Sequence, residues 1–369
     1  MKLACIVGAR PNFMKIAPIL RQLDQHEGVE TRLVHTGQHY DAVLSDVFFQ
    51  ELGIRRPDVS LEVGSGTHAR QTADILVAIE RLILHEAEKS TPFDRLVVVG
   101  DVNSTMAATL AASKLQVPVS HVEAGLRSRD RTMPEEINRI VTDGLSDMLL
   151  CSEPDGVANL LQEGHDESNI HLVGNVMIDT LLHQVEAAKQ RDALEQHELM
   201  PGEYAVVTLH RPSNVDDEAT LTKLIEVLRQ TARRLSVVFP VHPRTKKQLE
   251  RFGLMERLDQ APNIRLTGPM GYLEFLCLTS QAKVIVTDSG GLQEESTALG
   301  VPCLTMRSNT ERPITVTEGT STLIGSCPEK LATQLGHVIQ GEYKQGKSPE
   351  LWDGKAAERI AEVLVGSHR

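Results

Sequence analysis

The stretch VIVTDSGGLQEE, residues 284–295, decides the fold of this chain. A β-branched run ends at Asp288, and the pair Gly290-Gly291 leads into a segment of helical composition. A buried strand that turns through glycines into a helix is the repeating unit of a parallel α/β sheet. Glycine permits close backbone approach, and the N–H groups of a helix N-terminus favour phosphate. The stretch therefore predicts a parallel sheet and an anion site, although a plain turn with Ser289 as helix N-cap explains it equally well.

The same alternation of apolar runs and amphipathic stretches extends over the chain. The predicted strands are 3–7, 31–36, 96–99, 117–122, 148–151, 204–209, 236–241, 264–266, 283–287 and 301–305. The predicted helices are 16–23, 42–52, 72–86, 104–114, 134–145, 220–234 and a segment from the Gly-Gly turn to residue 299. Because strands alternate with helices, we predict doubly wound, Rossmann-like parallel sheets. The length of 369 residues favours two domains, with a boundary after residue 174.

Composition excludes several classes of function. The chain carries 38 Lys and Arg against 50 Asp and Glu, a net charge of −12, which argues against sequence-independent nucleic-acid binding. Aromatic residues make up 3%, too few for a site built on ring stacking. The five cysteines are scattered without a C-x-x-C pair, as expected of free thiols in a reducing compartment. With no signal-peptide pattern and no apolar run near ~20 residues, we predict a cytoplasmic protein with no membrane span.

Unusual polar residues follow the predicted strands. They are Arg10, Asp101, Glu123, His210, His242 and Ser289. In open α/β sheets, ligands bind beyond the carboxyl ends of the strands. In a two-domain protein, such ends can face each other across a cleft, where we expect the active site.

The residue types at these ends suggest two kinds of chemistry. Arg10 and Lys15 bracket a helix start, where cations are unfavourable unless an anion is near. Asp101 and Glu123 end apolar strands and are candidates for proton transfer. The neighbouring pair at 135–136 has a structural explanation as first-turn acids of a helix.

Further candidates lie in the second half. His210 and His242 each end a strand, a pattern that suggests a phosphate or acid–base role. Arg312 is a candidate phosphate ligand, and Glu295 could accept hydrogen bonds from ribose hydroxyls. No H-E-x-x-H motif occurs, and His35 and His39 flank a glycine turn unsuited to zinc, so we predict no metal site.

An ordered set of motifs resembles one enzyme family. The motifs are GARPNFMK (8–15), GQHYD (37–41), GD (100–101), HVEAGLRS (121–128), MPEEINR (133–139), GN (174–175), HRPSN (210–214), PVHPRT (240–245), TDSGGLQEE (287–295) and ERP (311–313). Together they resemble the non-hydrolysing UDP-N-acetylglucosamine 2-epimerases. The resemblance implies the GT-B architecture, a homodimer, and a final helix near 352–364 that returns to the first domain. The expected domains are then 1–174 with 352–369, and 175–351.

The resemblance also implies a reaction and residue roles. Members of the family interconvert UDP-N-acetylglucosamine and UDP-N-acetylmannosamine by eliminating UDP to 2-acetamidoglucal and adding it back, supplying cell-surface polysaccharide synthesis. No cofactor is implied, because no redox step occurs. Asp101, Glu123 and Glu135 are expected around carbon 2, without assignment of acid and base, and His210 near the glycosidic oxygen or phosphate. The residues implied to bind UDP are Arg10, Lys15, His242, Ser289, Gly290, Gly291, Glu295 and Arg312.

Departures from the family pattern leave alternatives open. Ala42 and Val43 stand where allosterically activated members carry a second Gln, and one Arg follows His210 instead of two, which argues against activation by a second substrate molecule. A 2-epimerase acting on UDP-2,3-diacetamido-glucuronate would use the same carboxylates, with Arg129 and Arg131 as candidate cations for the sugar carboxylate. Two further alternatives remain. One is a hydrolysing epimerase or a GT-B glycosyltransferase, and the other is a non-catalytic UDP-sugar binding module.

Overall fold

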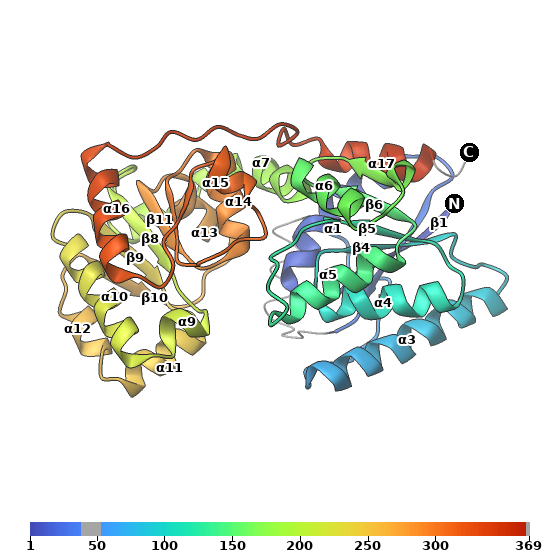
Figure 1. Ribbon diagram of the computed structural model, residues 1–369, viewed down its shortest axis with the longest axis horizontal. Helices are drawn as coiled ribbons and strands as arrows, with labels where there is room; N and C mark the ends of the chain where they lie inside the picture. Colours follow the sequence, from blue (N-terminus) through green and yellow to red (C-terminus); the bar gives the residue numbers. More distant parts are fainter. Residues whose placement is uncertain (38–52, 367–369) are drawn as a thin grey trace. The chain divides into compact units, whose positions relative to one another are not determined.

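The computed structural model describes residues 1–37 and 53–366, and its contacts divide the chain into two compact units (Figure 1). The first unit is Met1–Thr180 with Glu350–Arg369, and the second is Leu181–Pro349. The chain passes from the first unit to the second within α7 (Val176–Lys189), whereas the sequence places a boundary just before this helix. The helix predicted at 42–52, and most of the motif at 37–41 with His39, lie outside the described residues.

A seven-stranded sheet forms the centre of the first unit. Its strands are β1 (Lys2–Val7), β2 (Glu30–His35), β3 (Val59–Ser60), β4 (Arg95–Val99), β5 (Val119–Val122), β6 (Met148–Cys151) and β7 (Ile170–Leu172). The spatial order is β3-β2-β1-β4-β5-β6-β7, and every described pair is parallel. The order reverses between β1 and β4, as in a doubly wound sheet.

Helices cover this sheet. They are α1 (Arg10–Leu23), α3 (His68–Glu88), α4 (Asn103–Lys114), α5 (Pro134–Leu145), α6 (Pro154–Gln162), the start of α7, and α17 (Ala356–Gly366). Helix α4 packs between α3 and α5, and the three lie side by side in Figure 1. Ile75, Ile79 and Ile83 of α3 recur at helical spacing and are buried in a core with Ile6 and Val98 of the sheet.

The second unit contains a six-stranded parallel sheet. Its strands are β8 (Tyr204–Thr208), β9 (Ser236–Pro240), β10 (Ile264–Thr267), β11 (Val284–Thr287), β12 (Cys303–Thr305) and β13 (Ser321–Leu323). The order is β10-β9-β8-β11-β12-β13, which again reverses, here between β8 and β11. Its helices are the rest of α7, α8 (Ala193–Gln196), α9 (Pro212–Val215), α10 (Glu218–Thr231), α11 (Pro243–Arg251), α12 (Met255–Asp259), α13 (Tyr272–Ser280), α14 (Gly290–Leu299), α15 (Ile314–Thr317) and α16 (Pro328–Gln340).

Every predicted strand is present, and the prediction of two doubly wound parallel sheets is confirmed. The strands that sequence patterns missed are β3, β7 and β13, each at an edge of its sheet. An edge strand pairs on one side only and does not need a long apolar run. Two or three residues of mixed polarity therefore give no detectable signal.

Three predicted helix starts are wrong by four residues or more. Helix α3 begins at His68 rather than at residue 72. Helix α1 begins at Arg10 rather than at residue 16, because Pro11 fits the first turn of a helix. The final helix begins at Ala356 rather than at 352, and Gly354 just before it has a φ of 78°, outside the helical region. Among residues 1–37 and 53–366, no helix is both long and apolar enough to cross a membrane.

Helix α17 is hydrogen-bonded to the rest of the first unit through the buried carboxylate of Asp179. Asp179 of α7 accepts hydrogen bonds from the backbone N–H groups of Ala356 (3.1 Å) and Ala357 (2.7 Å). These are orphan donors of the first turn of α17. Burial raises the pKa of Asp179 to about 6, with a further contribution from the charge of Asp353.

This raised pKa predicts a pH-dependent stability. The folded state binds the Asp179 proton more tightly than the unfolded chain, so this stabilisation is complete below about pH 4 and is lost as the pH rises through about 6. The total change is on the order of 3 kcal/mol. Asp179→Asn cannot ionise and retains one acceptor. We expect this variant to gain stability relative to the parent between pH 4 and pH 7, measured by urea unfolding. Asp155→Asn, an exposed change on α6, serves as control. A difference between parent and variant that stays constant with pH would contradict the prediction.

Candidate active site

The turn after β1 is joined to β4 at the point where the first sheet reverses. The side-chain oxygen of Asn12 accepts from the N–H groups of Gly8 (3.2 Å) and Ala9 (2.9 Å). Its amide nitrogen donates to the carbonyl of Val99 at 2.9 Å. The N-terminus of α1 and the end of β4 are therefore held together. The side chain of Arg10 lies outside the described part of the chain, and its role in binding UDP stays a prediction.

Lys15 and Glu123 form a buried ion pair at this place. The Lys15 ammonium contacts the Glu123 carboxylate, and both residues are less than 10% exposed. Gly100 makes room for them: a Cβ atom there would lie 3.0 Å from Lys15 Nζ and 3.6 Å from Glu123 Oε2. Glu123 has a φ of 69°, a left-handed conformation that few residues other than glycine adopt. The structure thus brings together a predicted phosphate ligand and a predicted acid–base residue.

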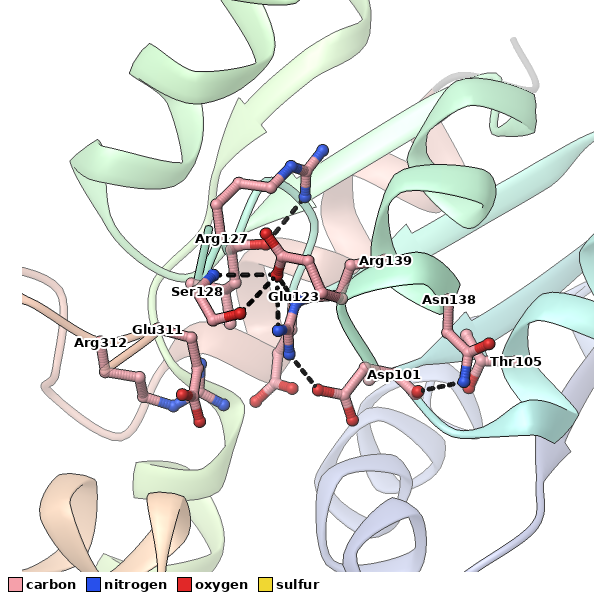
Figure 2. Close-up of polar contacts among 12 residues, drawn as sticks. Asp101, Thr105, Glu123, Arg127, Ser128, Asn138, Arg139, Glu311 and Arg312 are labelled. Carbon is pink, nitrogen blue, oxygen red and sulfur yellow. Dashed lines mark hydrogen bonds and ion pairs between the residues drawn. The ribbon is translucent and has the colours of Figure 1, made fainter. Parts of the chain in front are cut away.

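Asp101 is held by an arginine of α5. Its carboxylate lies 2.5 Å from Arg139 Nη1, and its backbone carbonyl accepts from the side-chain amide of Asn138 at 2.8 Å (Figure 2). Arg139 is buried and also contacts Glu136 at 2.7 Å. The Asp101 side chain stays partly exposed. One buried cation is therefore shared between an accessible carboxylate and an inaccessible one.

The two neighbouring glutamates of α5 have different environments. Glu136 is buried and accepts from the N–H groups of Ser128 (2.9 Å) and Arg129 (2.8 Å), so it anchors the loop before α5. Burial opposes its ionisation, but the Ser128 N–H and Arg139 outweigh burial and hold the pKa of Glu136 below its ordinary value. Glu135, predicted to act on the sugar, is exposed. Residue type and position do not separate these adjacent acids, because both occupy the first turn of the helix; only the family resemblance selects Glu135.

In the second unit, Asp288 organises the ends of β8 and β11. This fully buried carboxylate accepts from the N–H groups of His210 (2.9 Å) and Arg211 (2.9 Å) and from the Asn214 amide (3.0 Å). His210 Nδ1 lies 2.7 Å from Asp288, and the His210 side chain is 39% exposed. Burial opposes ionisation, but the hydrogen bond from His210 outweighs it and keeps the pKa of Asp288 low. A carboxylate that orients a partly exposed imidazole is an arrangement suited to proton transfer.

His242 has a different local role from His210. Its Nδ1 accepts from the backbone N–H of Arg244 at 3.2 Å, which makes it the N-cap of α11. The two imidazole rings lie 5.4 Å apart. Burial, together with the charge of His210, lowers the pKa of His242. His242 thus lies beside the predicted site at the carboxyl edge of the second sheet.

The glycine turn after β11 leads into α14, and two buried ion pairs lie near it. Ser289 is the N-cap residue, and a Cβ atom on Gly290 would lie 2.8 Å from Glu311 Oε1. Glu311 pairs with Arg307 at 2.6 Å. Burial opposes its ionisation, but Arg307 lowers the pKa of Glu311 to about 2. The predicted anion turn is therefore packed against acidic as well as basic side chains.

The predicted phosphate ligand Arg312 is itself ion-paired. Its Nε lies 2.6 Å from Glu294 Oε1, and both side chains are buried. Glu295, predicted to bind the ribose, is the next residue of α14 and is also buried. Gly291 has no atom within 4 Å of the place of a Cβ atom.

Several residues of the site were given no role by the sequence analysis. They are Arg139, Glu136, Asn138, Asp288, Arg307 and Glu311. All except Arg307 lie inside the quoted motifs, and Asp288 also ends a predicted strand directly before the glycine turn. Over the described residues, no three His, Cys, Asp or Glu side chains gather in a way that could hold a metal ion.

The fold and these residues define a class: a two-domain α/β protein of the GT-B architecture, with titratable groups at the carboxyl edges of both sheets. A family model described as UDP-N-acetylglucosamine 2-epimerase matches residues 21–365. The chain belongs to this family.

Relatives and solved structures agree with this assignment. The UDP-N-acetylglucosamine 2-epimerase of Methanocaldococcus jannaschii is 41% identical, covering 99% of each chain. The UDP-2,3-diacetamido-2,3-dideoxy-D-glucuronate 2-epimerase of Pseudomonas aeruginosa is 40% identical, again covering 99% of each chain. The crystal structure of the M. jannaschii enzyme in complex with UDP-GlcNAc and UDP superposes with a TM-score of 0.88 at 40% identity, covering 99% of this chain and 100% of that chain.

The glycine turn predicts contrasting effects of two neighbouring substitutions. Gly290→Ala places a methyl group against the Glu311 carboxylate and should destabilise the protein by about 1–3 kcal/mol. Gly291→Ala meets open space in a helix and should be neutral or stabilising by up to ~1 kcal/mol. Urea unfolding of both variants measures the difference. Equal stabilities would contradict the packing described here.

Proposed function

We propose that this protein is a UDP-N-acetylglucosamine 2-epimerase, which inverts carbon 2 to give UDP-N-acetylmannosamine. The observation that supports it most is the pair of carboxylates Asp101 and Glu123, each at the end of a strand in the first unit and each held by a cation. Membership of the family and the M. jannaschii relative indicate the substrate. The proposed product supplies cell-surface polysaccharide synthesis.

The proposed reaction begins with an elimination. A carboxylate removes the proton from carbon 2, and the electrons of that bond form the C1–C2 double bond. The bond between carbon 1 and the diphosphate oxygen breaks, and UDP leaves with its electron pair. UDP then adds back to carbon 1 of the glycal while a second acid delivers a proton to the opposite face of carbon 2. No electron acceptor is consumed, so the reaction needs no nicotinamide.

The residues of the first unit fit the carbon 2 chemistry. Inversion at one carbon requires groups that exchange protons on two faces, and Asp101, Glu123 and Glu135 are the proposed set. Arg139 contacts Asp101 and Lys15 contacts Glu123, so each of these two carboxylates has a cation beside it. A neighbouring cation also limits how far each carboxylate can move.

The residues of the second unit fit a diphosphate and its leaving oxygen. The N-terminus of α14, with Ser289, Gly290 and Gly291, presents backbone N–H groups and a positive dipole end. His210, oriented by Asp288, is proposed to act at the oxygen that leaves carbon 1. The remaining proposed UDP ligands are Arg10, Lys15, His242, Glu295 and Arg312.

A cytoplasmic homodimer is the proposed form of the protein. Helices α3 and α5 expose Val77, Leu84, Ile140 and Leu145, each 36% or more exposed. Apolar groups on two helices that flank the same third helix are a suitable surface for a second copy. Light scattering should give twice the chain mass of 40.6 kDa, and a single-chain mass would overturn this part of the proposal.

The sugar specificity has a second candidate. The P. aeruginosa relative is as similar as the M. jannaschii one and acts by name on UDP-2,3-diacetamido-2,3-dideoxy-D-glucuronate. Arg129, a sequence candidate for the sugar carboxylate, donates to Asn159 at 2.6 Å on the unit that carries Asp101. Turnover measured on both nucleotide sugars separates the two candidates.

Substitution of the Asp101 or the Glu123 carboxylate should slow epimerisation strongly while UDP binding persists. Loss of a general acid or base costs about 10²–10⁴-fold, so Asp101→Asn and Glu123→Gln should each lower kcat by at least 100-fold. Proton NMR in heavy water follows both the epimer and deuterium incorporation at carbon 2. Calorimetry should find UDP affinity within a few-fold of the parent.

Asp155→Asn, on the exposed side of α6, is the control for these variants. If the parent protein forms no epimer and incorporates no deuterium with either nucleotide sugar, the proposed function is wrong. If the parent is active and both carboxylate variants remain active, the proposed roles are wrong.

A further inference from the structure

A completely buried histidine lies beneath the carboxylates of the first unit. His121 of β5 has 0% exposure, and both of its ring nitrogens have partners. Nδ1 lies 2.6 Å from Asp143 Oδ1, and Nε2 lies 2.9 Å from the carbonyl oxygen of Gly100. The epimerisation chemistry proposed above gives this residue no role.

The partners of His121 determine which ring nitrogen must carry a proton. A backbone carbonyl can only accept a hydrogen bond, so Nε2 carries a proton. Asp143 also accepts from the N–H of Gly125 (3.0 Å) and pairs with Arg127 (2.7 Å). Burial opposes its ionisation, but His121 and Arg127 outweigh burial and hold the pKa of Asp143 below its ordinary value.

Arg127 also holds Asp143 in place. It pairs with Asp143 at 2.7 Å and with Glu163 at 2.6 Å. Asp143 is thus bound by His121, by Arg127 and by the N–H of Gly125.

The contact between His121 and Asp143 joins three segments that carry the proposed acid–base residues. Gly100, whose carbonyl His121 holds, directly precedes Asp101. His121 itself lies two residues before Glu123, and the N–H that Asp143 accepts belongs to Gly125, two residues after it. Asp143 lies on α5, the helix that begins at Pro134 and also carries Arg139. The ends of β4 and β5 and the helix α5 are thus fixed to one another through one buried contact.

We propose that His121 and Asp143 are positioning residues for the proton transfers at carbon 2. This inference rests on the proposed function. Neither side chain needs to touch substrate: His121 fixes the Gly100 carbonyl, and Asp143 fixes the turn after Glu123. Catalytic groups must be held to a fraction of an ångström, and a displacement of about 1 Å can cost ~100-fold in rate. Weakening the pair should therefore reduce turnover more than substrate binding.

The first experiment tests the hydrogen bond of His121 in the unaltered protein and requires no activity. Nitrogen NMR of protein labelled in its histidines should show one imidazole whose Nε2 carries a proton protected from exchange with solvent, as expected of a buried donor to the Gly100 carbonyl. That signal should be missing from His121→Gln, which assigns it. A His121 without a proton on Nε2 would overturn the inference.

The second experiment separates positioning from general stability. Asp143→Asn keeps the size of the side chain and removes the carboxylate that contacts His121 and Arg127. We expect kcat for the epimerisation to fall about 10- to 100-fold, with KM for the nucleotide sugar changed less than about threefold.

Glu86→Gln is the matched control. Glu86 forms a partly buried ion pair with Lys2 at the amino end of β1, at the opposite edge of the same sheet from Asp101. The Glu86→Gln variant should lower the unfolding midpoint by about as much as Asp143→Asn does, with kcat unchanged. A kcat loss in Asp143→Asn no larger than in Glu86→Gln would overturn the inference. If Asp143→Asn does not fold, His121→Gln carries the same kinetic test. An inactive parent protein refutes the proposed function instead, since the NMR result stands independently of turnover.

Discussion

The parallel pairing of β1 with β4, and of β8 with β11, is the constraint on which the rest of the structure depends. At these two places the strand order reverses, so the connections on either side diverge and leave the carboxyl ends of the strands uncovered by their own crossovers. The turn after β1 and the Gly100-Asp101 end of β4 meet there in the first unit. His210 after β8 and Asp288 after β11 meet in the second, 2.7 Å apart. Both groups of candidate residues result from the same topological rule.

The pairing of buried charges follows from the position of these strand ends. Uncovered strand ends collect polar side chains, and those that the fold then buries must be paired, because an isolated charge is costly away from water. Lys15 with Glu123, Arg139 with Glu136, Arg312 with Glu294 and Arg307 with Glu311 all satisfy this requirement. Asp101 differs, because its carboxylate is partly exposed while its partner Arg139 is buried. A carboxylate fixed at one side and open at the other is what proton exchange with a ligand requires.

The sequence predicts functional residues where their position along the chain, directly after an apolar run, identifies them. Asp101 and Glu123 were predicted because each directly follows an apolar run, and the parallel sheet places such residues at one edge. Arg139 was not predicted, because it lies inside an amphipathic helix, 38 residues from the Asp101 that it holds. Nor was Asp143, 22 residues from His121 on the same kind of helix. The edge strands β3 and β7 were missed because a strand paired on one side needs only a few residues of mixed polarity.

By itself, the sequence determined the two doubly wound sheets, the family, and the ends of strands at which chemistry is expected, since these depend on local periodicity and on ordered motifs. Only the tertiary structure decided which charges meet. It separated Glu136, which is buried and anchors a loop, from Glu135, which is exposed. It paired Lys15 with Glu123 and placed the buried His121 between Gly100 and Asp143. The physical reason is that hydrogen bonds and ion pairs act over a few ångströms, whereas the residues that form them lie tens or hundreds of positions apart along the chain.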